Sequence, residues 1–239
     1  MKLLKAASIA KFAYSNLPFP SGVARIQIKG KEVKYNYKFI EKNNTQAYIL
    51  ENDKELIVSI RGSKQLADVK DVFTVKKVFF EGVGLVHQGF LEGFYDLFDE
   101  VEKIINETDK QVYFIGHSLG GAVAKLLGLY YRYNHVTTIT FGEPKGCCDR
   151  ICSGNSEFIR ISNNMDMIPR IHLRYNHGVI KKEENHIYIK KNGKIVRNPS
   201  AYREFIDVMG NSLLKLFSVF IFIEMVNDHL MDSHINLLS

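Results

Sequence analysis

The residues that could carry chemistry in this chain centre on Ser118, the middle residue of a G-x-S-x-G motif at positions 116–120. An apolar, aromatic and β-branched run at 112–115 precedes the motif, and small and apolar residues with helical spacing follow it over 122–133. A strand that turns sharply into a helix presents a serine hydroxyl above a sheet and aims backbone N–H groups at developing negative charge. The pattern predicts a nucleophilic serine; the alternative is a glycine-rich turn in which Ser118 only caps the helix.

A serine hydroxyl is a weak nucleophile near neutral pH, so it needs a base and a carboxylate that orients this base. For a serine on such a turn, the acid follows the nucleophile in the chain and the base follows the acid. Asp166 lies in the loop after a strand-like run at 158–162, where a buried strand can hold its carboxylate at the edge of the sheet. Asp149 has no strand to aim it, and Asp207 lies in an expected surface helix. We therefore predict Asp166 as the acid.

The base must be one of five histidines after Asp166, which are His172, His177, His186, His229 and His234. His229 follows a long apolar stretch at 213–226, and a helix anchored there could carry an imidazole to the catalytic edge. His186 lies in a charged hairpin, which makes it a poorer candidate. We predict His229 as the base, with His234 as its rival.

Two donors are needed for the oxyanion that forms during acyl transfer. The backbone N–H of Leu119, directly after the nucleophile, can supply one of them. A strand-like run at 56–60 leads into Gly62 and Ser63, where Ser63 can offer its N–H and its hydroxyl and Gly62 lets the chain pass closely. Loss of one such donor typically lowers turnover by about 10²–10³-fold.

The elements that must position these residues alternate along the chain. Helical spacing predicts helices over 3–16 and 89–106, with irregular chain after the first and a mixed segment up to residue 86. Strand-like runs lie at 33–40, 45–50, 55–60, 136–140 and 157–162, and a basic hairpin is expected near 185–197. This order predicts an α/β fold with a mostly parallel sheet and helices on both faces. Ligands of such sheets gather at the carboxyl ends of the strands, where each candidate lies.

Composition and charge limit the class of protein. With 239 residues, 46% of them hydrophobic, and no linker or repeat, we expect one domain over 1–239. The formal charge is +6, and much of the basic excess surrounds the hairpin near 185–197. This charge indicates either a solvated hairpin or attraction to an anionic membrane or lipid-droplet surface. Because no nucleic-acid motif accompanies the charge, we expect no nucleic-acid partner.

The cysteines and the apolar stretches of the sequence indicate in which cellular compartment the protein is expected. Cys147, Cys148 and Cys152 are clustered and odd in number, which fits neither a secreted disulfide framework nor a zinc site. The N-terminal stretch at 1–17 is interrupted by lysines, so it predicts an amphipathic packing helix and not a signal peptide. The stretch at 213–226 is too short and too interrupted to span a bilayer, which favours a buried or interfacial helix. We therefore expect an intracellular protein.

Six segments in this order resemble the class 3 lipases, the family that includes the fungal triacylglycerol lipases. In chain order they are I-R-G-S at 60–63, V-H-Q-G-F-L at 86–91, G-H-S-L-G-G at 116–121, F-G-E-P at 141–144, D-M-I-P at 166–169 and D-H-L-M-D-S at 228–233. Their order and spacing fit over residues 45–238. The resemblance implies an α/β-hydrolase fold without a metal or cofactor, and a lid over 64–74. Its implied site consists of Ser118 as nucleophile, Asp166 as acid, His229 as base, and Ser63 and Leu119 in the oxyanion hole.

The chain departs from this family at three points. Where many relatives carry D-W-x-x-D in the lid, this chain has D-V-K-D at 68–71, which speaks against strong interfacial activation. His234 replaces a tyrosine that is common after the histidine segment. The three cysteines do not match the disulfide set of the secreted fungal members.

The combined reading predicts a serine esterase or lipase that hydrolyses carboxylic esters of acylglycerols through an acyl-enzyme, with a lipid or ester as its substrate. A phospholipase A1-type activity is the alternative, because the basic surface and the apolar C-terminal stretch also suit a phospholipid bilayer. A non-catalytic interaction module with a lipase fold is a further alternative, which the intact set of triad residues opposes.

Overall fold

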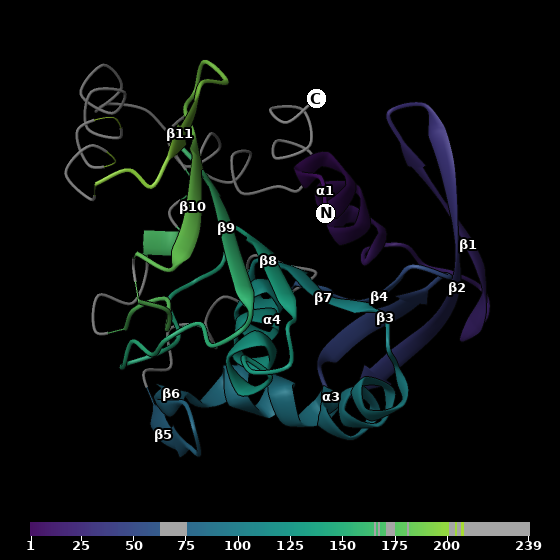
Figure 1. The fold of residues 1–239 in the computed structure, drawn as a ribbon, viewed down its shortest axis with the longest axis horizontal. Coiled ribbons are helices and arrows are strands. Elements are labelled where there is room, and N and C mark those ends of the chain that lie inside the picture. The colour runs from purple at the N-terminus through teal and green to yellow at the C-terminus, as the bar shows by residue number, and fades with distance from the viewer. Residues whose placement is uncertain are drawn as a thin grey trace.

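The computed structural model describes residues 1–62, 76–164, 166, 168–170, 175–180, 182–200, 204 and 207. Within these residues a nine-stranded sheet runs through the centre of the molecule, and helices cover both of its faces (Figure 1). The strands, in their order across the sheet, are β1 (Ser21–Ile28), β2 (Lys31–Lys42), β3 (Thr45–Glu51), β4 (Glu55–Ile60), β7 (Gln111–His117), β8 (Thr137–Phe141), β9 (Glu157–Asn163), β10 (Glu184–Ile189) and β11 (Ile195–Arg197).

The parallel part of the sheet is its middle. Strand β4 pairs in parallel with β7, β7 with β8, β8 with β9, and β9 with β10. The edges are antiparallel, through the meander β1-β2-β3-β4 on one side and the hairpin β10-β11 on the other. The predicted α/β class is thus confirmed, with antiparallel strands added at both edges. All carboxyl ends of the parallel strands meet at one edge, which is where such sheets bind ligands.

The helices divide between the two faces of the sheet. Helices α3 (Gln88–Glu107) and α4 (Leu119–Tyr130) lie on one face, and α1 (Leu3–Phe12) lies on the other (Figure 1). Because side chains alternate along a strand, each central strand feeds both cores. On β7, for example, Phe114 packs into the apolar cluster on the α3 and α4 side, whereas Ile115 packs into the cluster beneath α1.

Helix α1 is the packing helix that the N-terminal stretch predicts, although it ends at Phe12 and not near residue 16. Its buried face consists of Ala6, Ala7, Ile9 and Ala10. These mostly small side chains let the helix lie close to the sheet, and the Ser59 hydroxyl of β4 donates to the Ile9 carbonyl at 3.0 Å. The close packing also sets where the chain emerges after α1, which matters for Tyr14 below.

Several predicted elements agree with the structure and others do not. The run at 55–60 is β4, and the helix predicted at 89–106 is α3 with one more residue at each end. Strand β1 was expected to be irregular chain; only its Ala24 and Ile26 are buried, so its apolar signal is weak. The mixed segment before residue 86 contains the hairpin of β5 (Lys77–Phe80) and β6 (Gly84–His87), which forms a second small sheet.

The basic hairpin near 185–197 needs a correction. Its two strands pair as expected, but β10 is an inner strand that also pairs with β9 and is largely buried. Only β11 has the exposed pattern of a solvated hairpin. The apolar stretch at 213–226 lies outside the described residues. In the described ranges, no helix combines the length and the apolarity that crossing a membrane requires.

Helix α4 rests on β8 through Gly128, and this contact makes a first prediction. A Cβ atom at Gly128 would lie 2.0 Å from the Thr138 Oγ1 atom, so Gly128→Ala should lower the free energy of unfolding by about 1–3 kcal/mol through overpacking. The matched control is Gly89→Ala in α3, where the nearest atom, Cε1 of His87, lies at 3.4 Å. This control should be neutral or stabilising because alanine favours helices. Urea denaturation of both variants tests the contact, and equal effects would contradict it.

Candidate active site

Ser118 occupies a strained turn between the end of β7 and the start of α4. Its backbone has φ 55° and ψ −129°, a conformation that residues with a side chain rarely adopt. Such a conformation costs on the order of 1–3 kcal/mol and persists only where the surroundings enforce it. Here the Ser118 N–H donates to the Phe141 carbonyl at 2.9 Å, and the Ser118 carbonyl accepts the Gly121 N–H at 2.8 Å. The predicted strand–turn–helix context of the serine is therefore present.

The glycines of the motif are required by close backbone contacts. A Cβ atom at Gly116 would lie 2.2 Å from the Gly120 carbonyl oxygen, and one at Gly120 would lie 2.5 Å from the Ile60 carbonyl oxygen. Both distances are far below any contact that a methyl group tolerates. The G-x-S-x-G spacing thus reflects two places where strand, helix and the end of β4 nearly touch.

The chain after β4 passes directly beside the serine. A Cβ atom at Gly62 would lie 3.0 Å from the Ser118 Cβ atom and 2.6 Å from the His117 carbonyl oxygen. The next residue, Ser63, lies outside the described residues, as does the predicted lid at 64–74. On the other side of the serine, Leu119 is the first residue of α4. The first N–H groups of a helix have no acceptor within it, which makes the Leu119 amide a suitable oxyanion donor.

Asp166 lies at the same edge of the sheet as Ser118. The ends of the strands are tied together there, because the Gly142 N–H after β8 donates to the Ile161 carbonyl of β9 at 2.9 Å. Asp166 follows β9 and is fully buried. Its Oδ1 atom accepts the Ile168 N–H at 3.0 Å, at the start of the short 3₁₀ helix η2 (Ile168–Arg170). The Arg170 guanidinium donates to the backbone carbonyl of Asp166, which fixes this loop further.

The two carboxylates rejected on sequence grounds are engaged elsewhere. Asp149 accepts the Leu85 N–H of β6 at 3.4 Å. Asp207 accepts from the Tyr188 hydroxyl at 2.8 Å and from the Lys190 ammonium at 2.9 Å. The structure therefore brings Ser118, Leu119 and Asp166 to one edge. His229, its rival His234 and Ser63 lie outside the described residues, so their roles stay predictions.

A second serine–histidine–carboxylate row lies inside the sheet. The Ser162 hydroxyl of β9 is 2.8 Å from Nε2 of His186 on β10, and Nδ1 of His186 is 3.4 Å from the Glu204 carboxylate. Burial and the nearby Arg160 guanidinium hold the pKa of His186 far below its usual value, which makes this imidazole a poor base. Ser162 lies within an extended strand and is 1% exposed, so no substrate can reach it. The row links two strands and is not a catalytic site.

Beneath the first turns of α4 lies a buried charge cluster that the sequence did not predict. Its members are Lys125, Glu143, Arg160, His177 and Glu184. The Lys125 ammonium lies 2.5 Å from Glu184 and 3.4 Å from Glu143, while His177 Nδ1 lies 2.9 Å from Glu143. The Glu143 Oε2 atom has no partner among the described residues and adjoins a cavity of about 10 Å³, the space of one water molecule.

The protonation states of the cluster follow from its geometry. Burial, and then the Arg160 guanidinium, lower the pKa of His177 to about 4, so this imidazole is neutral near pH 7. Burial alone would lower the pKa of Lys125, but Glu143 and Glu184 raise it above its usual value. The neutral His177 thus completes a set of two cations and two carboxylates. Only Glu143 gave a local signal, through the F-G-E-P segment at 141–144.

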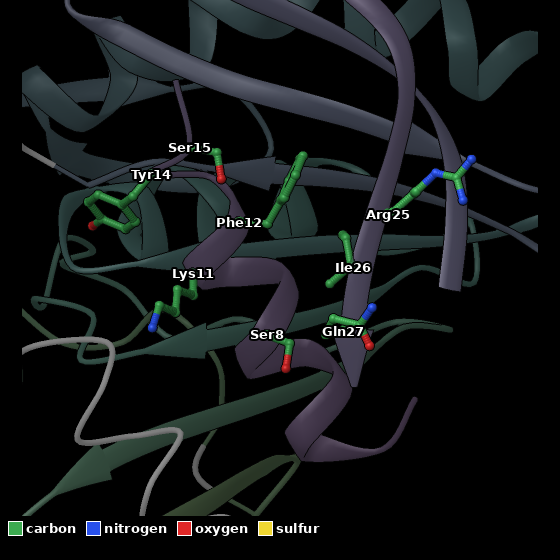
Figure 2. A pocket seen from close by; sticks show the side chains of 8 residues that line it. All are labelled: Ser8, Lys11, Phe12, Tyr14, Ser15, Arg25, Ile26 and Gln27. Atoms are coloured by element: carbon green, nitrogen blue, oxygen red, sulfur yellow. The ribbon is translucent and has the colours of Figure 1, made fainter. Parts of the chain in front are cut away.

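A groove of about 470 Å³ lies between α1 and β1, on the face of the sheet opposite α4 (Figure 2). Its lining residues are Ser8, Lys11, Phe12, Tyr14, Ser15, Arg25, Ile26 and Gln27. Within the described ranges, no three histidine, cysteine, aspartate or glutamate side chains converge as a metal site requires.

Comparison with known proteins connects this geometry to a family. The model of the Lipase (class 3) family matches residues 57–176, about half of the chain, and this match includes Ser118 and Asp166 but ends before His229. The fold is similar to that of a triacylglycerol lipase from Penicillium expansum, at 17% sequence identity over 87% of this chain and 86% of that chain, with a TM-score of 0.63.

Two other fungal structures are similar to this chain. A native Rhizomucor miehei lipase–propeptide complex gives a TM-score of 0.59 at 18% identity, over 82% of this chain and 69% of that chain. A nonglycosylated Yarrowia lipolytica lipase gives 0.56 at 18% identity, over 79% and 78% of the two chains. At these identities the structural similarity establishes the α/β-hydrolase fold alone. Membership in a family is shown instead by the match of the family model.

The charge cluster predicts how stability depends on pH. Because the pKa of His177 is about 4 in the folded protein and near 6.5 when unfolded, the unfolded chain binds more protons between these values. The free energy of unfolding should therefore fall as the pH drops from about 6.5 to 4, with His177 contributing on the order of 3 kcal/mol. Urea denaturation at several pH values should show a flatter dependence for His177→Gln.

A control for this prediction is His135→Asn, which removes an exposed histidine outside the cluster. Asparagine suits that position because His135 has a positive φ of 55°, which asparagine tolerates well. A His177→Gln variant whose pH dependence matches that of the wild type would contradict the assignment.

Proposed function

Because this chain belongs to the class 3 lipase family, we propose that it is a serine hydrolase that cleaves carboxylic esters of acylglycerols. The observation that carries the proposal is the conformation of Ser118, with φ 55° at the junction of β7 and α4. This strained turn holds the serine at the carboxyl edge of the sheet and leaves it half-buried. A backbone held in such a conformation is a feature that functional sites retain at the expense of stability.

In the proposed reaction, His229 accepts the proton of the Ser118 hydroxyl while the serine oxygen attacks the ester carbonyl. Asp166 orients the imidazole and stabilises its charged form. The N–H groups of Leu119 and Ser63 bind the oxyanion of the tetrahedral intermediate. The alcohol leaves with the proton from His229, and the acyl group stays on Ser118. Water, deprotonated by His229, then releases the fatty acid and restores the serine.

Some of these residue roles are supported by the structure and others by the sequence alone. Ser118 and Leu119 are supported by the geometry of the turn and the helix N-terminus. Asp166 is supported by its burial at the carboxyl end of β9 and by the hydrogen bond that fixes its carboxylate. His229 and Ser63 are supported by the D-H-L-M-D-S and I-R-G-S segments of the sequence. Contact with an anionic lipid surface and an intracellular location rest on sequence composition alone.

Substitution of the nucleophile tests the proposal directly. Ser118→Ala should lower the rate of p-nitrophenyl ester hydrolysis by about 10³-fold or more, because no other group in the scheme can form the acyl-enzyme. The matched control is Ser162→Ala, which disrupts the other serine–histidine row and should keep turnover near that of the wild type. Turnover that survives in Ser118→Ala but fails in Ser162→Ala would overturn the assignment.

The base and the acid are tested in the same assay. His229→Ala should lower turnover by about 10³-fold or more, whereas His234→Ala should have a much smaller effect. Asp166→Asn should also lower turnover strongly, with Asp149→Asn as the carboxylate control. The reverse order for the two histidines would assign the base to His234.

A labelling experiment separates an enzyme from a non-catalytic module with the same fold. A fluorophosphonate probe should modify wild-type protein at Ser118 and leave Ser118→Ala unlabelled. A chain that the probe does not modify would support the non-catalytic alternative. For a labelled enzyme, products from mixed glycerides and phospholipids then distinguish acylglycerol hydrolysis from phospholipase A1-type cleavage.

A further inference from the structure

The hydroxyl of Tyr14 lies within hydrogen-bond distance of two residues beside the proposed nucleophile. It accepts a hydrogen bond from the Gly62 N–H at 3.1 Å and lies 2.7 Å from Nδ1 of His117. Tyr14 follows α1, so it comes from the face of the sheet opposite α4. Figure 2 shows its ring directed away from Phe12 and Arg25 of the groove.

The position of Gly62 explains why this hydrogen bond matters. A Cβ atom at Gly62 would lie 2.6 Å from the Tyr14 hydroxyl oxygen and 3.0 Å from the Ser118 Cβ atom. Gly62 therefore fits closely between the phenol and the nucleophile. It is also the residue from which the chain enters Ser63, so the orientation of the Gly62 backbone sets the starting point of the expected oxyanion donor.

We infer that Tyr14 is a positioning residue of the active site, whose hydroxyl holds Gly62 and His117 at a fixed spacing beside Ser118. The inference rests on the proposed hydrolase function. It assigns to the N-terminal segment, which precedes the family match at 57–176, a direct part in the geometry of the reaction centre. Tyr14 does not touch the reacting atoms in this role; it acts through Gly62 and His117.

The hydrogen-bond donors and acceptors of Tyr14, Gly62 and His117 are consistent with this role. A phenol has one proton and can also accept, so a Tyr14 oxygen that accepts from Gly62 keeps its own proton for Nδ1 of His117. In that arrangement Nδ1 of His117 is the acceptor, which corresponds to the imidazole tautomer with its proton on Nε2. Burial raises the pKa of Tyr14 to about 12, which keeps the phenol protonated throughout the range in which such an enzyme works. The Arg61 guanidinium lies 5.1 Å from the ring and contributes a cation–π contact.

The Tyr14 hydroxyl can be removed without removing the contacts that hold the N-terminal segment on the sheet. Helix α1 is held by its buried alanines and Ile9, and the residue after Tyr14 is held separately, because the Tyr48 hydroxyl donates to the Ser15 carbonyl at 2.9 Å. Tyr14→Phe keeps the ring and its packing and deletes only the group that binds Gly62 and His117. Its effect on catalysis can therefore be separated from an effect on folding.

The first test is the kinetics of Tyr14→Phe with a soluble p-nitrophenyl ester. We expect kcat to fall by about 10–100-fold with KM within about twofold of the wild type, because a displaced oxyanion donor weakens binding of the transition state more than that of the substrate. The matched control is Tyr37→Phe, which deletes another tyrosine hydroxyl bound to the N-terminal segment, here at the Phe19 carbonyl. This control should leave kcat unchanged, and both variants should melt near the wild-type temperature.

A second test measures the hydrogen bond from the Gly62 N–H to the Tyr14 hydroxyl directly. Arginine is followed directly by glycine only at Arg61–Gly62 in the whole sequence, so labelling with ¹³C-carbonyl arginine and ¹⁵N-glycine gives a single amide signal. This amide should exchange slowly with solvent in the wild type. In Tyr14→Phe it should exchange faster and shift upfield, while Tyr37→Phe should leave it in place. Fast exchange in the wild type overturns the inference without any variant.

The outcomes distinguish this inference from the proposed function. If wild type and Ser118→Ala are equally inactive, the proposed function fails and the role of Tyr14 fails with it. If Ser118→Ala abolishes hydrolysis but Tyr14→Phe retains wild-type kcat, the hydrolase stands and only the role of Tyr14 is overturned. A lowered kcat with an unmoved Arg61–Gly62 signal also overturns it, because the loss then has another cause.

Discussion

The close approach of backbone segments at Ser118 is the constraint on which the rest of this structure depends. At Gly116, Gly120 and Gly62 the neighbouring main chains lie nearer than any Cβ atom would allow. Two pieces of chain that are far apart in sequence, 60–62 and 116–121, therefore meet around one residue with φ 55°. The turn cannot relax, because its own N–H and carbonyl are bonded to β8 and to the first turn of α4. Strain at one residue is thus maintained by the packing of the whole sheet edge.

Each face of the sheet supports this junction in its own way. On the α4 face, Lys125 and Glu143 tie the second turn of the helix to the loop after β8, within a cluster of charges that are individually costly to bury. On the α1 face, a row of small residues brings the helix close enough for Tyr14 to reach the junction. One face therefore uses a charge network and the other a single neutral hydrogen-bonded phenol. Glu143 lies beside Gly121 at the start of the helix, and Tyr14 lies beside Gly62, which contacts Ser118.

The sequence predicted those parts of the molecule that leave a local signal. β4, α3 and the serine turn follow from hydrophobic periodicity and glycine spacing within short windows, and the position of Asp166 after β9 follows from the strand-like run before it. The charge cluster leaves no such signal, because its members come from α4, β9, β10 and two loops that only tertiary structure brings together. The contact of Tyr14 with Gly62 spans 48 residues for the same reason. β1 was missed because an edge strand with only two buried side chains has little periodicity.

Ser162 and Ser118 differ in the features that separate a structural hydroxyl from the proposed nucleophile. Ser162 has a short hydrogen bond to His186, and His186 has a carboxylate behind it, so the row satisfies the connectivity of a triad. It differs from Ser118 in two ways: its serine lies within a regular strand, and its imidazole is kept neutral by burial and by the Arg160 guanidinium. Ser118 has a strained backbone and the start of a helix, and Gly120 next to it admits the end of β4. The acyl transfer proposed for Ser118 therefore depends on where the serine lies relative to backbone donors, and not only on its pairing with an imidazole.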